Sequence, residues 1–240
     1  MYYDSYNRNV YSQNGEDGIL EVIISELGID IPNMWLCECG AYDGISYSHV
    51  RLLIERGANA VMIEPCFVGD LCEEKFTKLQ HLPKIFPKVH TLNHFTKISN
   101  KDISDAGYLY LLKFHKICGL EFSPPQKTLD ESLREIPTFP EEYDLLNIDI
   151  DSYDHNVWVE HKLNPKIVVI EVNSSLPPIP TDKSRGWSFG DSLELGMRKG
   201  YSCVCHTGNM IYIRNDLLNK LSLPKELINS IKLFNQEWMK

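Results

Sequence analysis

The sequence predicts an α/β domain built on a mostly parallel sheet. Apolar runs typical of buried strands alternate with segments in which apolar residues recur every three or four positions, as in amphipathic helices. This alternation is the pattern of successive β-α-β units, whose strands lie parallel. Near the C-terminus, two apolar runs flank Gly208-Asn209, a pair typical of a tight hairpin turn. The expected sheet is therefore mixed, with helices on both faces.

The first half of the chain supplies three strands and the helices between them. Residues 12–28 are expected to form a helix, because Ser12 or Asn14 can cap it, acidic residues suit its first turn and Gly28 ends it. Glycine or proline punctuates the segments that follow. The expected elements are strand 34–40, helix 48–57, strand 59–65, helix 70–82 and strand 88–95.

The second half contains an irregular stretch and then returns to alternating elements. Residues 96–127 show no sustained period, and we expect an irregular insertion within a single domain of residues 1–240. A Pro-rich loop at 174–187 is expected on the surface. The regular elements are helix 127–136, strand 143–151, helix 155–162, strand 166–173, helix 188–200, two hairpin strands around Gly208-Asn209 and a terminal helix over 223–240.

Composition narrows the class of protein. The formal net charge of −9 argues against a general nucleic-acid binder, which usually presents a basic face. No apolar run approaches the roughly 20 residues that a membrane span requires, and the N-terminus lacks the apolar core of a secretory signal. We therefore expect a cytoplasmic protein without a membrane span.

The cysteines are expected to be structural. The chain has seven of them, an odd number, and none forms a CxxC pair. Two CxC pairs, Cys37/Cys39 and Cys203/Cys205, lie in strand-like runs, so a four-cysteine zinc site is conceivable. Small buried apolar side chains in a reducing compartment are the favoured interpretation.

Glycines and acids follow the first two strands, where ligands bind to an open α/β sheet. The stretch ECGAYDG places Glu38, Gly40, Asp43 and Gly44 at the end of the first strand. It is neither a G-x-G-x-x-G fingerprint nor a Walker A loop, and its spacing fits a nucleoside-binding turn, although any tight strand–helix turn needs glycine. Glu64 ends the second strand and can accept hydrogen bonds from both ribose hydroxyls, or else it is a solvated loop carboxylate.

Further acids follow the fourth and fifth strands. Asp149, Asp151 and Asp154 come after the fourth strand, and Glu171 and Asn173 come after the fifth. Neighbouring parallel strands would bring these side chains to one edge of the sheet, where their oxygens suit Mg²⁺ or Mn²⁺. The alternative is that some of them face water, and that Asp154 only caps the following helix.

One histidine stands out as a candidate for proton transfer. His155 directly follows the acid cluster, and His206 before the hairpin turn is a distant second. The remaining histidines show no partner in the sequence and are expected to be structural or exposed: His49, His81, His90, His94, His115 and His161.

Five motifs together resemble the FkbM-type methyltransferase group. They are YSQNGEDG (11–18), ECGAYDG (38–44), MIEP (62–65), DLLNIDIDSYDH (144–155) and KIVVIEVNSSLPP (166–178). The resemblance spans about residues 11 to 214, and Ser152 stands where this group usually has glycine. It implies the Rossmann-like fold of class I methyltransferases, with a seven-stranded sheet whose last pair is antiparallel.

The resemblance also implies an activity, which is methyl transfer from S-adenosylmethionine (SAM) to a hydroxyl of a sugar or glycan. Gly40 and Gly44 would pack against SAM, Glu64 would hold its ribose and Glu38 its methionine end. Further cofactor contacts are expected from Gln13, Glu16, Asp17 and Asp43.

The acids after the fourth and fifth strands take the remaining roles in this interpretation. A divalent cation held by Asp149, Asp151, Glu171 and Asn173 would orient the acceptor, and Asp149, Asp154 or His155 would serve catalysis, the last two by taking the proton. Arg185 and Trp187 of the Pro-rich loop would form an acceptor wall. The alternatives are a nucleotide-dependent oxidoreductase, which the absent G-x-G-x-x-G disfavours, and a non-catalytic module that binds SAM or glycans.

Overall fold

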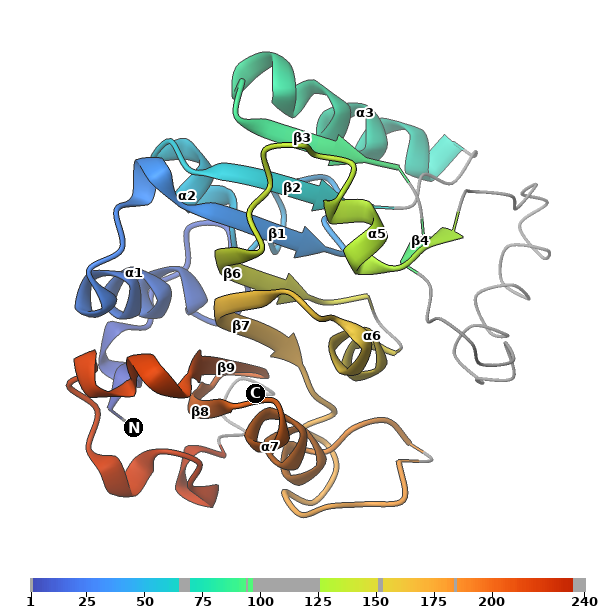
Figure 1. Ribbon diagram of the computed structural model, residues 1–240. Helices are drawn as coiled ribbons and strands as arrows, with labels where there is room; N and C mark the ends of the chain where they lie inside the picture. Colours follow the sequence, from blue (N-terminus) through green and yellow to red (C-terminus); the bar gives the residue numbers. More distant parts are fainter. Residues whose placement is uncertain are drawn as a thin grey trace.

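A seven-stranded mixed sheet forms the centre of the molecule (Figure 1). The computed structural model describes residues 2–64, 70–93, 95–96, 126–150, 153–183 and 185–234. The strand order is β3-β2-β1-β6-β7-β9-β8, in which only β9 runs against its neighbours. The strands are β1 Trp35–Cys39, β2 Asn59–Ile63, β3 Val89–Leu92, β6 Glu142–Ile148, β7 Asn164–Glu171, β8 Tyr201–His206 and β9 Asn209–Arg214. The predicted mixed sheet with a C-terminal hairpin is confirmed.

Helices cover both faces of this sheet. One hydrophobic core lies beneath α1 (Glu16–Leu27), α2 (Arg51–Glu55) and α3 (Asp70–Ile85). The other lies beneath α5 (Leu129–Leu133), α6 (Asp154–Glu160) and α7 (Phe189–Arg198). Short 3-10 turns connect or follow these elements: η1 Tyr3–Tyr6, η2 Ile31–Asn33, η3 Asn215–Lys220, η4 Lys225–Leu227 and η5 Ile231–Leu233. No described helix is long and apolar enough to cross a membrane.

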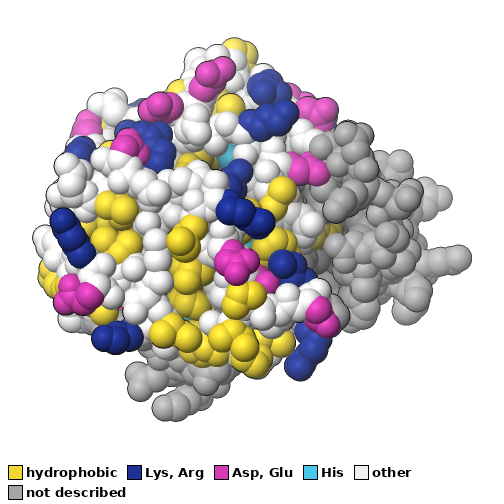
Figure 2. All heavy atoms as spheres, turned by 60° about the horizontal axis from the view of Figure 1, so that its bottom comes forward, with side chains coloured by type: hydrophobic (Ala, Val, Ile, Leu, Met, Phe, Trp, Pro, Cys, Tyr) yellow, Lys and Arg dark blue, Asp and Glu magenta, His cyan; other side chains and the backbone are white. Residues whose placement is uncertain are grey.

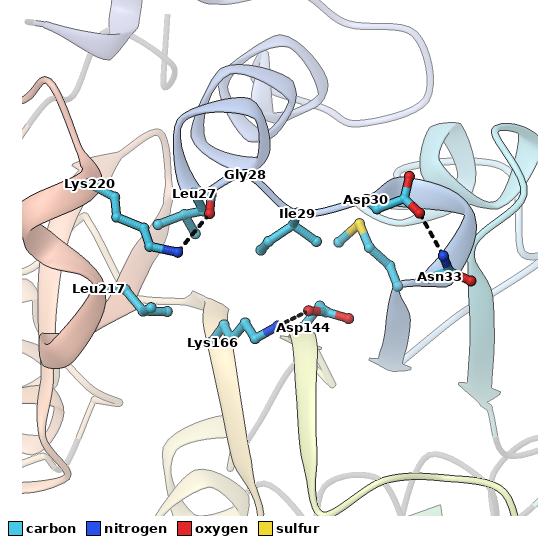
Figure 3. Close-up of a pocket in the computed structure, with 10 residues that line it drawn as sticks. Leu27, Gly28, Ile29, Asp30, Asn33, Asp144, Lys166, Leu217 and Lys220 are labelled. Atoms are coloured by element: carbon cyan, nitrogen blue, oxygen red, sulfur yellow. Dashed lines mark hydrogen bonds and ion pairs between the residues drawn. The ribbon is translucent and has the colours of Figure 1, made fainter.

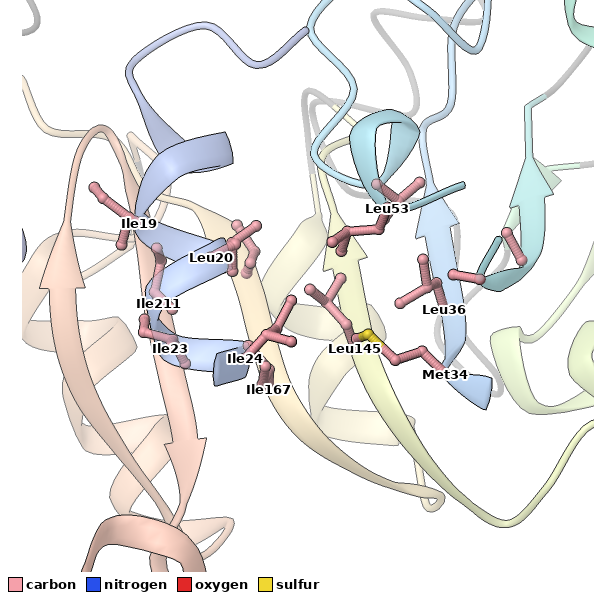
Figure 4. Packing of buried hydrophobic residues seen from close by; sticks show 14 of the residues in the cluster. Ile19, Leu20, Ile23, Ile24, Met34, Leu36, Leu53, Leu145, Ile167 and Ile211 are labelled. Carbon is pink, nitrogen blue, oxygen red and sulfur yellow. The ribbon is translucent and has the colours of Figure 1, made fainter. Parts of the chain in front are cut away.

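The helix α1 packs by the apolar spacing that the sequence shows. Its side chains at 19, 20, 23 and 24 point at the sheet and meet residues such as Leu145, Ile167 and Ile211 (Figure 4). Gly28 ends the helix in a left-handed conformation, as expected. The N-terminal cap differs from the prediction, because Gly15 occupies that position. Ser12 instead accepts the amide of Asp17 within the first turn, at 3.0 Å.

Two short strands border the segment predicted to be irregular. β4 (Phe95–Thr96) pairs in parallel with β5 (Gln126–Lys127), so the two ends of the segment lie side by side. Most of the segment itself, 97–125, lies outside the described residues.

The C-terminal segment does not form the predicted helix over its described part, residues 223–234. It is an extended chain with two 3-10 turns, η4 and η5. Asn229 explains the difference, because its backbone amide and side-chain oxygen pair with Cys203 of the edge strand β8. Leu233 then docks into the core under α7. This contact shields the edge of the sheet, which a regular helix could not pair with.

Candidate functional site

Polar side chains replace the apolar core at the carboxyl edge of the sheet, on the face that α1 covers. Leu36 and Leu145 are followed on the same face by Glu38 and Asn147, which pair in register between β1 and β6. Asn209 is the first residue of β9 and lies on the same face of the sheet as Ile211. All three polar residues are buried. Buried polar groups at a strand tip are costly unless they are paired, so they mark this edge as a candidate site.

Glu38 is a buried carboxylate held by neutral donors. It is 1% exposed and accepts the Ser48 hydroxyl at 2.7 Å and the His49 amide at 2.9 Å. The Asn147 side-chain amide donates to it at 3.2 Å. Burial disfavours the charged form and raises the pKa of Glu38 to about 7, although the nearby His49 opposes this.

His49 and Glu16 form a buried ion pair beside Glu38. The His49 Nε2 lies 3.8 Å from the Glu16 Oε1, and both side chains are almost fully buried. Burial lowers the pKa of His49, but Glu16, Glu38 and Asp149 outweigh it and bring the value to about 9. Burial raises the pKa of Glu16, but the His49 partner and the Thr207 hydroxyl outweigh it and bring the value to about 2.

We call this group of side chains the buried polar network: Glu16, Glu38, His49, Asn147 and Asn209. Asn209 closes it, since its side-chain nitrogen lies 3.1 Å from His49 Nε2 and 3.4 Å from Glu16 Oε1. The Nδ1 of His49 and the Oδ1 atoms of Asn147 and Asn209 are buried with no hydrogen-bond partner among the described residues. Buried polar atoms without a partner are normally hydrogen-bonded by a ligand or by water.

The glycine turn after β1 is packed against its surroundings. Gly40 has φ +90°, and a Cβ there would lie 1.6 Å from the carbonyl oxygen of Asp149. Gly44 has φ +72°, and a Cβ there would lie 2.5 Å from a methyl carbon of Leu82 in α3. Gly40 therefore needs glycine because the clash is with backbone, whereas at Gly44 the neighbour is the end of a leucine side chain and the positive φ is what favours glycine. Their predicted contact with SAM stays a prediction.

The carboxylate of Glu64 ties the tip of β2 to this turn. It accepts the backbone amide of Tyr42 at 2.8 Å. Tyr42 has φ +50°, a left-handed conformation that costs a non-glycine residue about 1–2 kcal/mol. The hydrogen bond helps to hold that conformation, so the two elements predicted to bind a nucleoside are joined at one place. Retained strain of this kind is frequent at functional sites.

Two of the other predicted cofactor contacts organise backbone. Asp43 accepts the amides of Ile45 and Ser46 and so shapes the loop after Gly40. Asp17 accepts, through one carboxylate oxygen, the amides of residues 10–12 and the Ser12 hydroxyl. Gln13 is exposed at the entry to α1. Asp17 therefore shapes the loop before α1, and Asp43 shapes the loop after Gly40.

The predicted cation ligands are only partly brought together. Asp151 lies outside the described residues, and Glu171 is exposed at the end of β7. The amide of Asn173 is engaged, because it donates to the Arg185 carbonyl oxygen at 2.8 Å and its oxygen accepts the Ser175 amide at 3.1 Å. Among the residues that the structure describes, no group of three or more His, Cys, Asp or Glu side chains could hold a metal ion. The described side chains do not fit one.

The two residues nominated for proton transfer are held in place by the protein. Asp154 accepts the Ile150 amide at 2.6 Å and so closes the loop before α6. The His155 ring is buried, stacks on Trp187 at 4.7 Å and has its Nε2 2.7 Å from the Ser192 hydroxyl. Burial lowers the pKa of His155 to about 3, so the ring is neutral. These contacts lie on the α6–α7 face, away from the buried polar network.

The sequence interpretation missed His49, which it treated as structural or exposed. The chain gives little local signal, because the side-chain partners Glu16 and Asn209 come from α1 and from the start of β9. The one available clue was the acidic pair in YSQNGEDG, which begins α1 against the tips of the strands.

A cavity of about 240 Å³ lies at the opposite, amino edge of the sheet (Figure 3). Its charged groups are paired: Lys166 donates to Asp144 at 2.7 Å, and Lys220 donates to the Leu27 carbonyl oxygen at 3.0 Å. The lining residues are Leu27, Gly28, Ile29, Asp30, Asn33, Met34, Asp144, Lys166, Leu217 and Lys220. None of the residues predicted to bind SAM lines it.

The described cysteines behave as small buried side chains. Cys37, Cys39, Cys203 and Cys205 are buried free thiols. Burial raises the pKa of Cys39 to about 12 and raises that of Cys37 as well, which keeps both thiols protonated. The two pairs lie on β1 and β8, which β6, β7 and β9 separate in the sheet, and no described group of three or more such side chains could hold a metal ion, so these four residues do not fit the zinc alternative.

Charged side chains of both signs are scattered over the face shown in Figure 2. Lys and Arg do not gather there into one basic patch, and hydrophobic side chains form a band between them. This arrangement agrees with the acidic net charge of the chain.

Known proteins match this chain by the fold of their solved structures and not by sequence. No protein-family model and no curated protein matches the sequence. A caffeoyl-CoA O-methyltransferase candidate from Staphylococcus aureus shares 10% identity over 89% of this chain and 88% of its own, with a TM-score of 0.48. A SAM-dependent methyltransferase from Aquifex aeolicus shares 10% identity over 89% and 97%, with a TM-score of 0.43. The methyltransferase FkbM from Methylobacillus flagellatus shares 15% identity over 76% and 44%, with a TM-score of 0.44.

Proposed function

We propose that this chain is a SAM-dependent O-methyltransferase whose acceptor is a hydroxyl of a sugar or glycan. One observation carries the proposal: Glu64 at the tip of β2 is hydrogen-bonded to the glycine turn at the tip of β1, beside the acidic buried polar network. This is the place where an open α/β sheet binds ligands. The motifs shared with FkbM-type methyltransferases support the same cofactor.

The residues at this edge suit a positively charged nucleoside cofactor. Glu64 is placed to accept hydrogen bonds from ribose hydroxyls. Glu38 and Glu16 supply buried negative charge, and Gly40 allows the turn to lie close against the end of β6. When bound, SAM supplies an electrophilic methyl group on a sulfonium.

The chemistry required of the protein is alignment and proton removal. The acceptor oxygen forms a bond to the methyl carbon, the carbon–sulfur bond breaks with its electron pair left on sulfur, and the hydroxyl proton goes to a base or to water. Oriented reactions of this kind can gain about 7–11 kcal/mol from positioning. The proposal assigns no step to a metal ion, because the described side chains do not fit one.

The loop 174–187 is the expected acceptor wall in this proposal. Trp187 stacks on His155, and Lys183 lies over the Trp187 ring at 4.9 Å, so the indole is fixed at the end of this loop. His155 and Lys183 cover the indole ring, so a sugar would have to displace the exposed Lys183 side chain to stack on Trp187. Asp149 and Asp154, which follow β6, are the expected catalytic carboxylates in this proposal.

Methyl transfer from labelled SAM to a panel of mono- and oligosaccharides tests the proposal. We expect label in at least one sugar, and loss of at least tenfold in transfer for Glu64→Ala, because a lost hydrogen bond to a charged group is worth about 1.5–3 kcal/mol. Transfer to none of the sugars, with SAM still bound, would favour the non-catalytic module. Binding of NAD in place of SAM would favour the oxidoreductase.

A further inference from the structure

The buried polar network contains two acidic side chains, Glu16 and Glu38, and one cationic side chain, His49. Glu38 accepts hydrogen bonds only from the neutral groups of Ser48, Asn147 and the His49 backbone, among the contacts that the structure describes. The cationic side chain of His49 acts on Glu38, but its ring is paired with Glu16 from α1. Asp149, which follows β6, adds a further negative charge close enough to influence both.

The same network has two unpartnered acceptors against one unpartnered ring nitrogen, the Nδ1 of His49. The side-chain oxygens of Asn147 and Asn209 are buried, and no described residue donates to them. A buried acceptor without a donor costs about 1–3 kcal/mol, so such atoms are normally satisfied by a ligand or water. Unpartnered oxygens beside an uncompensated carboxylate favour a ligand that brings positive charge and N–H donors.

We propose that Glu38 carries an exchangeable proton in the empty protein and releases it to solvent when the cationic methyl donor binds. The O–H bond of the carboxyl group breaks, the proton goes to buffer, and the carboxylate remains opposite the positive charge. This inference rests on the proposed function, since it takes SAM as the ligand. It adds a specificity role for Glu38, which would distinguish cationic from neutral ligands.

The electrostatics of the site support the proton exchange. Burial holds the pKa of Glu38 at about 7, with Asp149 raising it and His49 lowering it. A bound cation lowers the pKa of a neighbouring carboxyl group, so binding near neutral pH is linked to proton loss. A group of this pKa that must ionise for binding raises the affinity about tenfold between pH 6 and pH 8.

Calorimetric titration with SAM in buffers of different ionisation enthalpy measures this release. At pH 7 we expect the native protein to release about half a proton more per SAM than Glu38→Gln does. The titration of SAM itself is common to both proteins and cancels in the difference. Glu226→Gln, which removes an exposed carboxylate in η4, is the matched control and should behave like the native protein.

Equal proton release from the native protein and Glu38→Gln, with SAM bound by both, would overturn the inference and leave the proposed function standing. If Glu38→Gln does not fold, the native protein provides the test through 5′-methylthioadenosine, a neutral analogue. The ratio of the SAM affinity to the analogue affinity should then rise several-fold with pH from 5 to 6.5, a range in which the amino group of SAM stays protonated, and a constant ratio would overturn the inference. Failure of the native protein to bind SAM at all would instead reject the proposed function.

Discussion

Replacing Gly40 with alanine is expected to abolish SAM binding and to lower the free energy of unfolding by about 4 kcal/mol. The new Cβ would lie 1.6 Å from the carbonyl oxygen of Asp149, and φ is +90°, where a side chain is strained in any case. The clash is with backbone, so the glycine turn must move away from β6 and from Glu64. Urea unfolding and calorimetric titration with SAM measure the two effects.

Gly28→Ala is the matched control for this substitution. Gly28 also has a positive φ, at +69°, but a Cβ there would have no atom within 4 Å. Its expected cost is only the strain of a left-handed residue, about 1–2 kcal/mol, with SAM binding unchanged. If Gly40→Ala lost no more unfolding free energy than Gly28→Ala and still bound SAM with the native affinity, the described contact between the glycine turn and the end of β6 would be contradicted.

The second large effect is expected from Glu16→Gln, which should destabilise the protein by about 3–5 kcal/mol. The substitution leaves the imidazolium of His49 buried without its partner and weakens the contact with Thr207. Glu135→Gln is the control, because Glu135 pairs with Lys127 at the surface, where an ion pair contributes at most about 1 kcal/mol. Equal losses in the two variants, measured by urea unfolding, would contradict the assignment of a buried ion pair.

The ion pair also predicts how stability depends on pH. The pKa of His49 is raised from 6.5 to about 9, so its contribution is complete below pH 6.5 and is lost as the pH rises through 9. The pKa of Glu16 is lowered from 4.5 to about 2, so its contribution is complete above pH 4.5 and is lost as the pH falls through 2. Unfolding free energies should therefore fall between pH 6.5 and 9 in the native protein, and Glu16→Gln should flatten that fall.

Glu38 also lowers the stability of the folded protein as the pH rises, but over a lower pH range than His49 does. Its pKa is raised from 4.5 to about 7, so the folded state holds a proton that the unfolded chain has lost. Stability therefore decreases as the pH rises from 4.5 to 7 and is unaffected by this group at higher pH. A native protein that became more stable between pH 6.5 and 9 would contradict the charges assigned to the buried polar network.

The sequence predicts the sheet well because its strands are set by local patterns. The apolar runs, the glycines that follow α1, α2 and α7, and the Gly208-Asn209 turn all act over a few residues. The strands β1, β2, β6 and β7 and the hairpin appear where these patterns place them. The tail was predicted wrongly over 223–234 because Asn229 binds Cys203 of an edge strand, a contact between distant positions. Local helical spacing carries no information about such a partner.

The residues of the candidate site also divide into those set by local patterns and those set by distant contacts. The carboxyl ends of parallel strands must meet, so the positions of Glu38 and Glu64 could be predicted from the chain alone. The role of His49 could not, because it depends on Glu16 and on Asn209, which is 160 positions away. Ser12 and Asp17 show the same limit, since their mutual hydrogen bonds shape a loop that no periodicity describes.

Titration of SAM into the native protein, Glu64→Ala and Lys166→Ala tests the central claim most directly. The two substitutions lie at opposite edges of the sheet. Glu64 follows β2 and is hydrogen-bonded to the glycine turn after β1, and Lys166 lines the cavity at the amino edge. We expect micromolar binding by the native protein, a loss of at least tenfold for Glu64→Ala and no change for Lys166→Ala. Binding that is insensitive to Glu64→Ala but lost in Lys166→Ala, or no binding at all, would contradict a SAM site at the carboxyl edge.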